Sequence, residues 1–115
     1  MEEKLKMAML FDFFGELLTE KQREYFRLYY DEDLSLAEIA QNNNISKQGV
    51  RDVICRSEKI LLETEKKTGT VERFEKMRRD IDKIEGRLKK ILENPAKRTD
   101  AEINSIIELL QPLKI

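Results

Sequence analysis

Three features of the sequence predict an all-α protein. Glycine and proline together number six among 115 residues, which disfavours a turn-rich β fold. Valine occurs three times against fourteen leucines and eleven isoleucines, so the β-branched residue most typical of strands is scarce. Charged residues make up 39% of the chain, and apolar residues recur at spacings of three and four, the pattern of helices with one buried and one solvated face.

Helix start and stop signals divide the chain into six predicted helices. Capping boxes, in which a hydroxyl and a Glu or Gln side chain satisfy free amide groups, are expected at Thr19, Ser35 and Thr99. Ser46 is a plain N-cap, because Gly49 stands where a box would need Glu or Gln. Gly69 fits a C-terminal cap, and Pro112 ends the last helix. The predicted helices span residues 4–17, 19–31, 35–42, 46–67, 71–93 and 99–111.

The predicted first helix is apolar around almost its whole circumference. The apolar residues that indicate this are Leu5, Met9, Leu10, Phe13, Phe14 and Leu17. We therefore expect this helix to be largely buried.

The composition restricts the chemistry of the chain. There is no histidine, and the four glycines are scattered, so neither a histidine-based catalytic site nor a phosphate-binding glycine loop is expected. We predict no enzyme, no cofactor and no metal site. The single Cys55 forms no internal disulfide, is expected to be an inert and partly exposed thiol, and fits a reducing cytoplasmic setting. No apolar run approaches the length of a membrane span, so no membrane insertion is predicted.

The C-terminal third of the chain has the pattern of a coiled coil. Six residues alternate at spacings of three and four along residues 71–93, the narrow seam of a heptad repeat: Phe74, Met77, Ile81, Ile84, Leu88 and Ile91. An intramolecular hairpin with the 99–111 helix would cover part of this seam. A homodimer through 71–93 is the second interpretation. The two interpretations overlap, because the 99–111 helix is too short to cover the whole seam of the 71–93 helix.

The most specific signal lies at residues 36–56 and predicts a helix-turn-helix. Ala40 is small where two helices must approach closely, and Asn44 stands at the turn, where a positive φ is required. Ile45 fills the space between the helices and Ser46 caps the second one. Four residues would form the inner face: Ile39, Val50, Val53 and Ile54.

In such motifs the start of the second helix enters the major groove of DNA. Side chains there can pair with base edges, glutamine with adenine and arginine or lysine with guanine, and the free amide groups of the helix start can hold a phosphate. The predicted recognition helix is 46–56. The candidate DNA-binding residues are Ser46, Lys47, Gln48, Arg51 and Asp52, with Arg56 and Lys59 as further phosphate contacts.

The charge distribution leaves other partners open. Residues 46–98 carry sixteen basic and ten acidic side chains, whereas residues 1–45 carry five basic and ten acidic. The basic residues of 71–93 could follow a phosphate backbone, although the acidic residues between them favour salt-bridged solvation of that helix. A protein partner, or structured RNA bound by shape and phosphate contacts, is therefore an alternative to DNA.

Two families share these motifs. The segments Leu18-Thr19-Glu20-Lys21-Gln22, Ser35-Leu36-Ala37-Glu38-Ile39-Ala40 and Ile45-Ser46-Lys47-Gln48-Gly49-Val50 resemble the fourth conserved region of bacterial sigma factors. With the preceding segment Met9-Leu10-Phe11-Asp12-Phe13-Phe14, the chain is similar over nearly its whole length to the YlxM family of small helix-turn-helix proteins. This resemblance implies a regulatory protein linked to the signal recognition particle pathway, with the RNA or the protein of that particle as possible partners.

Together these observations predict a sigma-like helix-turn-helix bundle over residues 1–67. A C-terminal helical hairpin, or oligomerisation extension, follows over residues 71–115: a long coiled-coil-like helix and then a short one. The leading functional interpretation is a DNA-binding regulatory protein of the cytoplasm. The alternative is an adaptor that binds the protein or RNA of the signal recognition particle.

Overall fold

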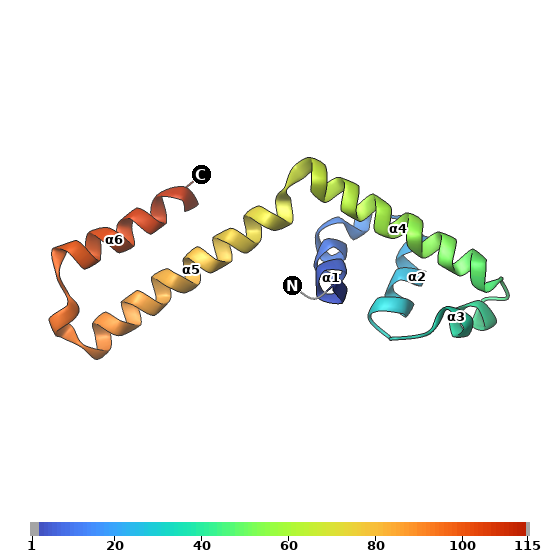
Figure 1. Cartoon of the computed structure of the whole chain (residues 1–115), viewed down its shortest axis with the longest axis horizontal. Helices are drawn as coiled ribbons and strands as arrows, with labels where there is room; N and C mark the ends of the chain where they lie inside the picture. The colour runs from blue at the N-terminus through green and yellow to red at the C-terminus, as the bar shows by residue number, and fades with distance from the viewer. Residues whose placement is uncertain (1–2, 115) are drawn as a thin grey trace. The chain divides into compact units, whose positions relative to one another are not determined.

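The computed structural model describes residues 3–114, and they divide into two compact units, one up to Val71 and one from Glu72 onward (Figure 1). Every regular element in the described part of the chain is helical. The first unit holds α1 (Glu3–Phe14), the 3-10 turn η1 (Gly15–Leu17), α2 (Glu20–Tyr30), α3 (Leu36–Asn42) and α4 (Lys47–Thr68). The second holds most of α5 (Thr70–Glu93), then η2 (Pro95–Lys97), α6 (Asp100–Leu110) and η3 (Gln111–Leu113). The prediction of six helices in an all-α fold is confirmed.

The caps explain why the helices begin where they do. The Thr19 and Ser35 hydroxyls accept bonds from the amides of Gln22 and Glu38, whose side chains accept in return from the cap amides. Both capping boxes are therefore present. The third predicted box, at Thr99, does not form, because Thr99 caps α6 through its hydroxyl alone.

Gly69 ends α4 in the left-handed conformation, with φ 62°. The backbone amide of Gly69 donates to the Glu65 carbonyl, and the amide of Val71 donates to the Glu65 side chain at 2.9 Å. Only glycine adopts this φ without a Cβ penalty, so α5 begins as a separate helix instead of continuing α4.

Helix α4 is the central element of the first unit and packs against α1, α2 and α3. One core cluster lies towards its C-terminal half, where Leu61 meets Phe26, Met7 and Leu10. A second cluster lies towards its N-terminal half and holds the helix-turn-helix together: Tyr25, Ile39, Ala40, Val50 and Ile54.

The expectation that the first helix is largely buried is wrong. Met7 and Leu10 are buried, but Leu5 is 60% exposed and Phe13 40%. Leu17, in η1, is 59% exposed. Helix α1 packs mainly against α4 and, to a smaller extent, against α2, and these two helices leave part of its circumference uncovered. The α-helix also ends at Phe14, three residues earlier than predicted.

The second unit is an antiparallel hairpin of α5 and α6. Ile84 and Ile91 of α5 are buried against Ile106 of α6, with Leu109 and Leu113 packed beside them. Arg87 of α5 donates a hydrogen bond to Ser105 of α6. Asn94 and Pro95 end α5 and start the connection. Of the six seam positions, Ile84 and Ile91 are buried in the cluster with Ile106 of α6.

Candidate nucleic-acid interface

The turn of the helix-turn-helix has the geometry that its sequence predicts. Asn44 lies at φ 54°, and the amide of Ile45 closes the turn on the Ala40 carbonyl at 3.2 Å. Ala40 is buried and Ile45 half-buried in the cluster that joins α3 to α4. A short left-handed connection of this kind sets the angle at which α4 leaves α3.

Ser46 fixes the first turn of α4. Its hydroxyl accepts a hydrogen bond from the amide of Gly49 at 2.9 Å. A Cβ at position 49 would lie 3.1 Å from this same oxygen, a tight contact that the glycine avoids. The other amide groups of the first turn have no helical carbonyl to bond, so they can bind an acceptor from outside.

The inner and outer faces of α4 separate as predicted. Val50 and Ile54 are fully buried, while Val53 is half-buried at the edge of the cluster. All seven predicted DNA-binding residues are exposed: Ser46, Lys47, Gln48, Arg51, Asp52, Arg56 and Lys59. The helical period places Gln48, Asp52 and Lys59 on the side directly opposite the core, Arg51 on one flank and Arg56 on the other. If α4 lay in a DNA groove, Arg51 and Arg56 would therefore face the two opposite walls of that groove. They could not both face the base edges at its floor.

One feature of this surface was not predicted from the sequence. The Gln48 side-chain amide donates to the Asp52 carboxylate at 2.9 Å. The spacing of four residues was the available signal, because polar pairs at that distance meet on a helix. The pair leaves the Gln48 carbonyl oxygen available as an acceptor, and Asp52 places a negative charge among the positive groups.

Arg51 borders a small hollow between α4 and the facing ends of α2 and α3. The hollow is lined by Tyr29, Leu36, Arg51, Ile54, Cys55 and Glu58. Cys55 is exposed there, more than the partial exposure expected. Next to it, the Tyr30 hydroxyl donates a hydrogen bond to the Glu58 carboxylate. Burial first, and then this bond, raise the pKa of Tyr30 above its ordinary value, so the bond persists over the whole neutral range.

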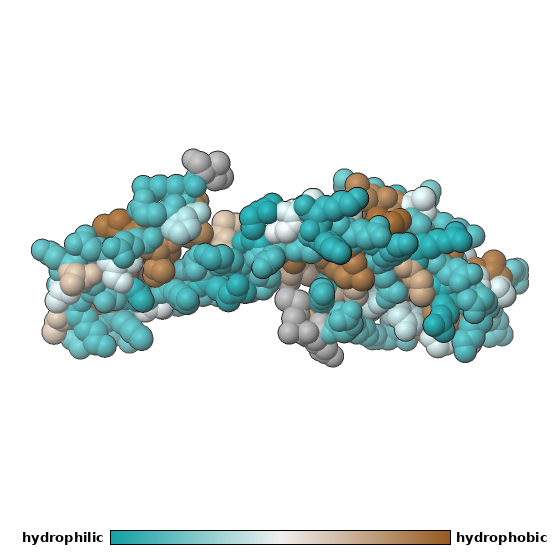
Figure 2. All heavy atoms as spheres, turned by 45° about the horizontal axis from the view of Figure 1, so that its top comes forward, coloured by the Kyte–Doolittle hydropathy of each residue, from teal (hydrophilic) through white to brown (hydrophobic). Residues whose placement is uncertain are grey.

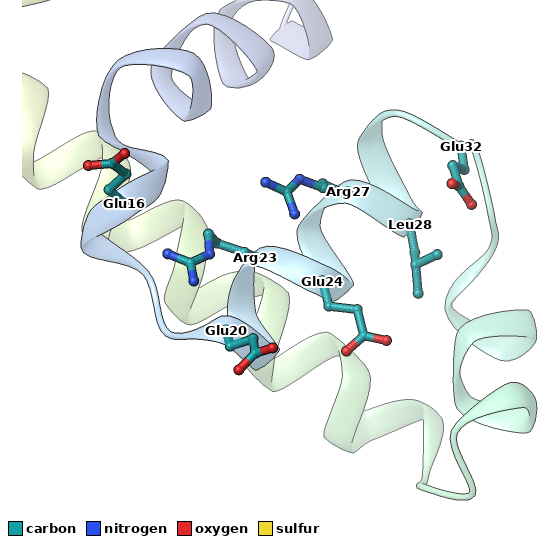
Figure 3. A pocket seen from close by; sticks show the side chains of 7 residues that line it. All are labelled: Glu16, Glu20, Arg23, Glu24, Arg27, Leu28 and Glu32. Atoms are coloured by element: carbon teal, nitrogen blue, oxygen red, sulfur yellow. The ribbon is translucent and has the colours of Figure 1, made fainter.

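A second charged surface lies on the outward side of α2 and is mainly acidic (Figure 3). Four carboxylates and two guanidinium groups line a shallow hollow: Glu16, Glu20, Glu24 and Glu32 with Arg23 and Arg27. Arg27 also lies over the ring of Phe11, 5.3 Å from its centre. The excess of negative charge makes this face unsuitable for a phosphate backbone.

A third surface lies on α5. Basic residues recur at spacings of three and four along one side of it: Lys76, Arg79, Lys83, Arg87 and Lys90. The ion pairs expected between the basic and acidic residues of this solvated helix are present in part. Lys76 pairs with Asp80 at 3.0 Å, and Lys89 pairs with Glu85 at 3.2 Å. Within residues 3–114, however, Lys83 and Lys90 make no ion pair.

Neither a metal-binding cluster nor a membrane-spanning helix occurs among the described residues. What the fold and this surface define is a helix-turn-helix protein, in which a capped second helix presents a polar face to solvent.

The chain belongs to a family whose model is described as "Putative helix-turn-helix protein, YlxM / p13 like" and matches residues 1–102. A UPF0122 protein of Thermoanaerobacter sp. is 43% identical over 107 residues, covering 93% of this chain and 89% of the relative. A UPF0122 protein of Halalkalibacterium halodurans is 40% identical over 114 residues and 99% of both chains. Another, from Clostridium acetobutylicum, is 48% identical over 83 residues, 72% of this chain and 71% of the relative. The resemblance to the YlxM family is confirmed.

Proposed function

We propose that this protein is a DNA-binding regulator of the cytoplasm that reads its site with the N-terminal half of α4. The observation that carries the proposal is the capped start of α4, held by the left-handed turn at Asn44 with its outer positions exposed. Membership in a helix-turn-helix family supports it. In this proposal residues 1–67 bind DNA and residues 71–115 form an oligomerisation extension.

The proposed reading surface assigns a role to each exposed side chain. Lys47 and Arg51 contact guanine or phosphate, and the acceptor oxygen of Gln48 faces the bases. Ser46 and the free amides of the first turn hold a phosphate at the helix start. Asp52 orients Gln48 through the 2.9 Å bond. Arg56, on the flank opposite Arg51, and Lys59, one to two turns further along the helix, contact the phosphate backbone.

The experiment is a binding titration against genomic DNA fragments and, in parallel, cellular RNA that includes the RNA of the signal recognition particle, at two salt concentrations.

The test variant is Lys47→Ala with Arg51→Ala. The matched control is Lys66→Ala with Lys67→Ala, which removes the same charge from two exposed residues in the last turn of the same helix. We expect the test variant to lose about tenfold or more of its specific affinity, since each base contact contributes ~1–3 kcal/mol. The salt dependence should also weaken. The control should keep the sequence preference. Equal losses in the two variants would reject groove reading by α4.

Asp52 gives a second, opposite test of the same surface. Asp52→Asn removes a negative charge from the proposed interface while keeping a side chain that can bond Gln48. We expect affinity for DNA of any sequence to rise several-fold at low salt, because repulsion of the phosphates is lost. Unchanged affinity would place the DNA elsewhere.

An adaptor function is the second candidate, and the acidic hollow on α2 is the observation that favours it (Figure 3). A basic segment of a protein partner, such as the protein of the signal recognition particle, would complement its four carboxylates. The variant Glu20→Gln with Glu24→Gln removes two of them from exposed positions. Loss of binding to the purified particle protein, with DNA binding intact, would support the adaptor. Binding that is unchanged would reject it.

A further inference from the structure

The hairpin of α5 and α6 leaves a large part of its apolar surface uncovered. Helix α6 has 11 residues and α5 has 24, so the shorter helix covers only part of the longer one. Figure 2 shows apolar surface gathered along this hairpin at the left of the picture. Seven large apolar side chains of the hairpin are between 36% and 77% exposed: Met77, Ile81, Leu88, Leu92, Ile103, Ile107 and Leu110.

The exposed residues of α5 lie on one side of the helix. With 3.6 residues per turn, successive residues are rotated by about 100°. Measured from the buried Ile84, the four exposed apolar residues of α5 lie about 20–80° around the axis, all in the same rotational sense. The basic row from Lys76 to Lys90 lies about 60–140° in the opposite sense.

The exposed residues of α6 lie on the same face of the hairpin as those of α5. Measured from the buried Ile106, the residues Ile103, Ile107 and Leu110 lie about 40–100° around the axis of α6. Viewed along the chain direction of each helix, this is the same rotational sense as that of the exposed apolar residues of α5. Because α5 and α6 are antiparallel, equal rotation in the two helices points to one side of the plane that contains them. The hairpin therefore has one continuous apolar face and one polar face, where Arg87 bonds Ser105.

We propose that this apolar face docks against the same face of a second copy of the chain, so that two hairpins form a four-helix bundle. The inference deepens the proposed function, because two helix-turn-helix units on one assembly bind DNA more tightly than one. It enlarges the homodimer surface predicted over 71–93, since α6 contributes three of the seven residues.

The area of the face favours a second copy. Partial exposure of seven large side chains amounts to several hundred Å², on the order of the largest apolar patch that a typical monomer shows, ~300–600 Å². With the polar residues around it, the face approaches the roughly 800 Å² per partner of a stable interface.

The architecture and the charges also fit a copy of the same chain. A hairpin is half of a four-helix bundle, and a two-fold axis pairs one patch with itself. The rim of the face carries interspersed charges of both signs, with Arg78, Glu85 and Lys89 on α5 and Asp100 on α6. Glu85 and Lys89 already compensate each other at 3.2 Å. Two copies can therefore meet without strong repulsion between like charges. A nucleic acid, by contrast, would gain no binding energy from an apolar surface.

The test is the mass of the full-length protein in solution, measured by sedimentation equilibrium between about 1 and 200 µM without nucleic acid. The test variant is Leu88→Glu with Ile107→Lys, which removes one exposed apolar residue from each helix and keeps the net charge. The control is Lys83→Ala, on the polar face. Ile84 is unsuitable for substitution, because it is buried against α6.

We expect the natural protein and the control to have twice the chain mass of 13.7 kDa. The test variant should be a monomer with unchanged helical circular dichroism. A natural protein that stays monomeric at 200 µM would overturn the inference, and so would a test variant that stays dimeric. If the test variant loses its helicity, Leu92→Lys replaces it; Leu92 is 77% exposed at the end of α5. This variant should weaken the dimer at least tenfold, and no weakening would count against the proposal.

These outcomes are separate from those of the proposed function. Loss of the dimer should leave the effect of Lys47 and Arg51 on a single DNA half-site intact. Loss of half-site binding in the Lys47 and Arg51 variant should leave the dimer intact.

Discussion

Replacing Asn44 by glycine should stabilise the helix-turn-helix, although the change removes a side chain. Asn44 lies at φ 54°, where a residue with a Cβ pays a penalty of roughly 1–2 kcal/mol that asparagine only partly offsets. Glycine pays no such penalty, but it has more freedom to lose on folding, by about 0.5–1 kcal/mol. We therefore expect Asn44→Gly to raise the free energy of unfolding by a few tenths of a kcal/mol, up to about 1 kcal/mol. Asn44→Val, with a branched Cβ, should lower it by about 1–2 kcal/mol.

The neighbouring Asn43 provides the control. It lies at φ −113°, where glycine has no advantage, and its side-chain amide donates to the Ile39 carbonyl at 2.8 Å. Asn43→Gly should therefore lower the free energy of unfolding by about 1–2 kcal/mol, from the lost hydrogen bond and the added chain entropy. The same substitution at adjacent positions has opposite predicted signs.

The assay is urea unfolding followed by tyrosine fluorescence. The protein has no tryptophan, and its three tyrosines, Tyr25, Tyr29 and Tyr30, all lie in α2. The signal therefore reports on the first unit and is insensitive to the hairpin. The midpoint should move while the slope with urea stays constant. If both glycine variants shift the midpoint in the same direction, the conformational argument for Asn44 is refuted.

Two further predictions concern the packing of α4. Tyr30→Phe should lower stability at neutral pH by about 1 kcal/mol, because Glu58 loses its donor. The pKa of Tyr30 is raised in the folded state above the ordinary 10.0. Its contribution to stability is therefore complete below pH 10 and is lost above it, so urea midpoints between pH 9 and 11 should fall less steeply in the variant than in the natural protein. Leu61→Ala should cost about 2–5 kcal/mol, since Leu61 has no exposed surface and its loss leaves a cavity. The matched change Leu62→Ala, at a residue 39% exposed, should cost less than half as much, and equal costs would contradict the assigned core.

Local signals determined the secondary structure of this protein. Hydroxyl caps at Thr19, Ser35 and Ser46 fixed the helix starts, and Asn44 and Gly69 adopt the left-handed conformations that their residue types indicate. These effects act within four residues, so the sequence alone contains them. The helix-turn-helix and the exposure of all seven candidate DNA-binding residues follow from the same period of apolar positions along α4.

Only the tertiary structure decided which apolar residues are covered. Leu5 and Phe13 are as apolar as Met7 and Leu10, yet they are exposed because the main neighbours of α1, helices α4 and α2, leave part of its circumference uncovered. Along α5 the heptad treats Ile84 and Leu88 alike, but α6 covers the first and leaves the second exposed. A hydrophobic pattern states that a residue favours burial, while the partner that covers it depends on helix lengths and on how the chain turns. The exposed face of α4 is determined by the sequence of that helix alone. The apolar face of the hairpin, by contrast, exists only once α5 and α6 pack together.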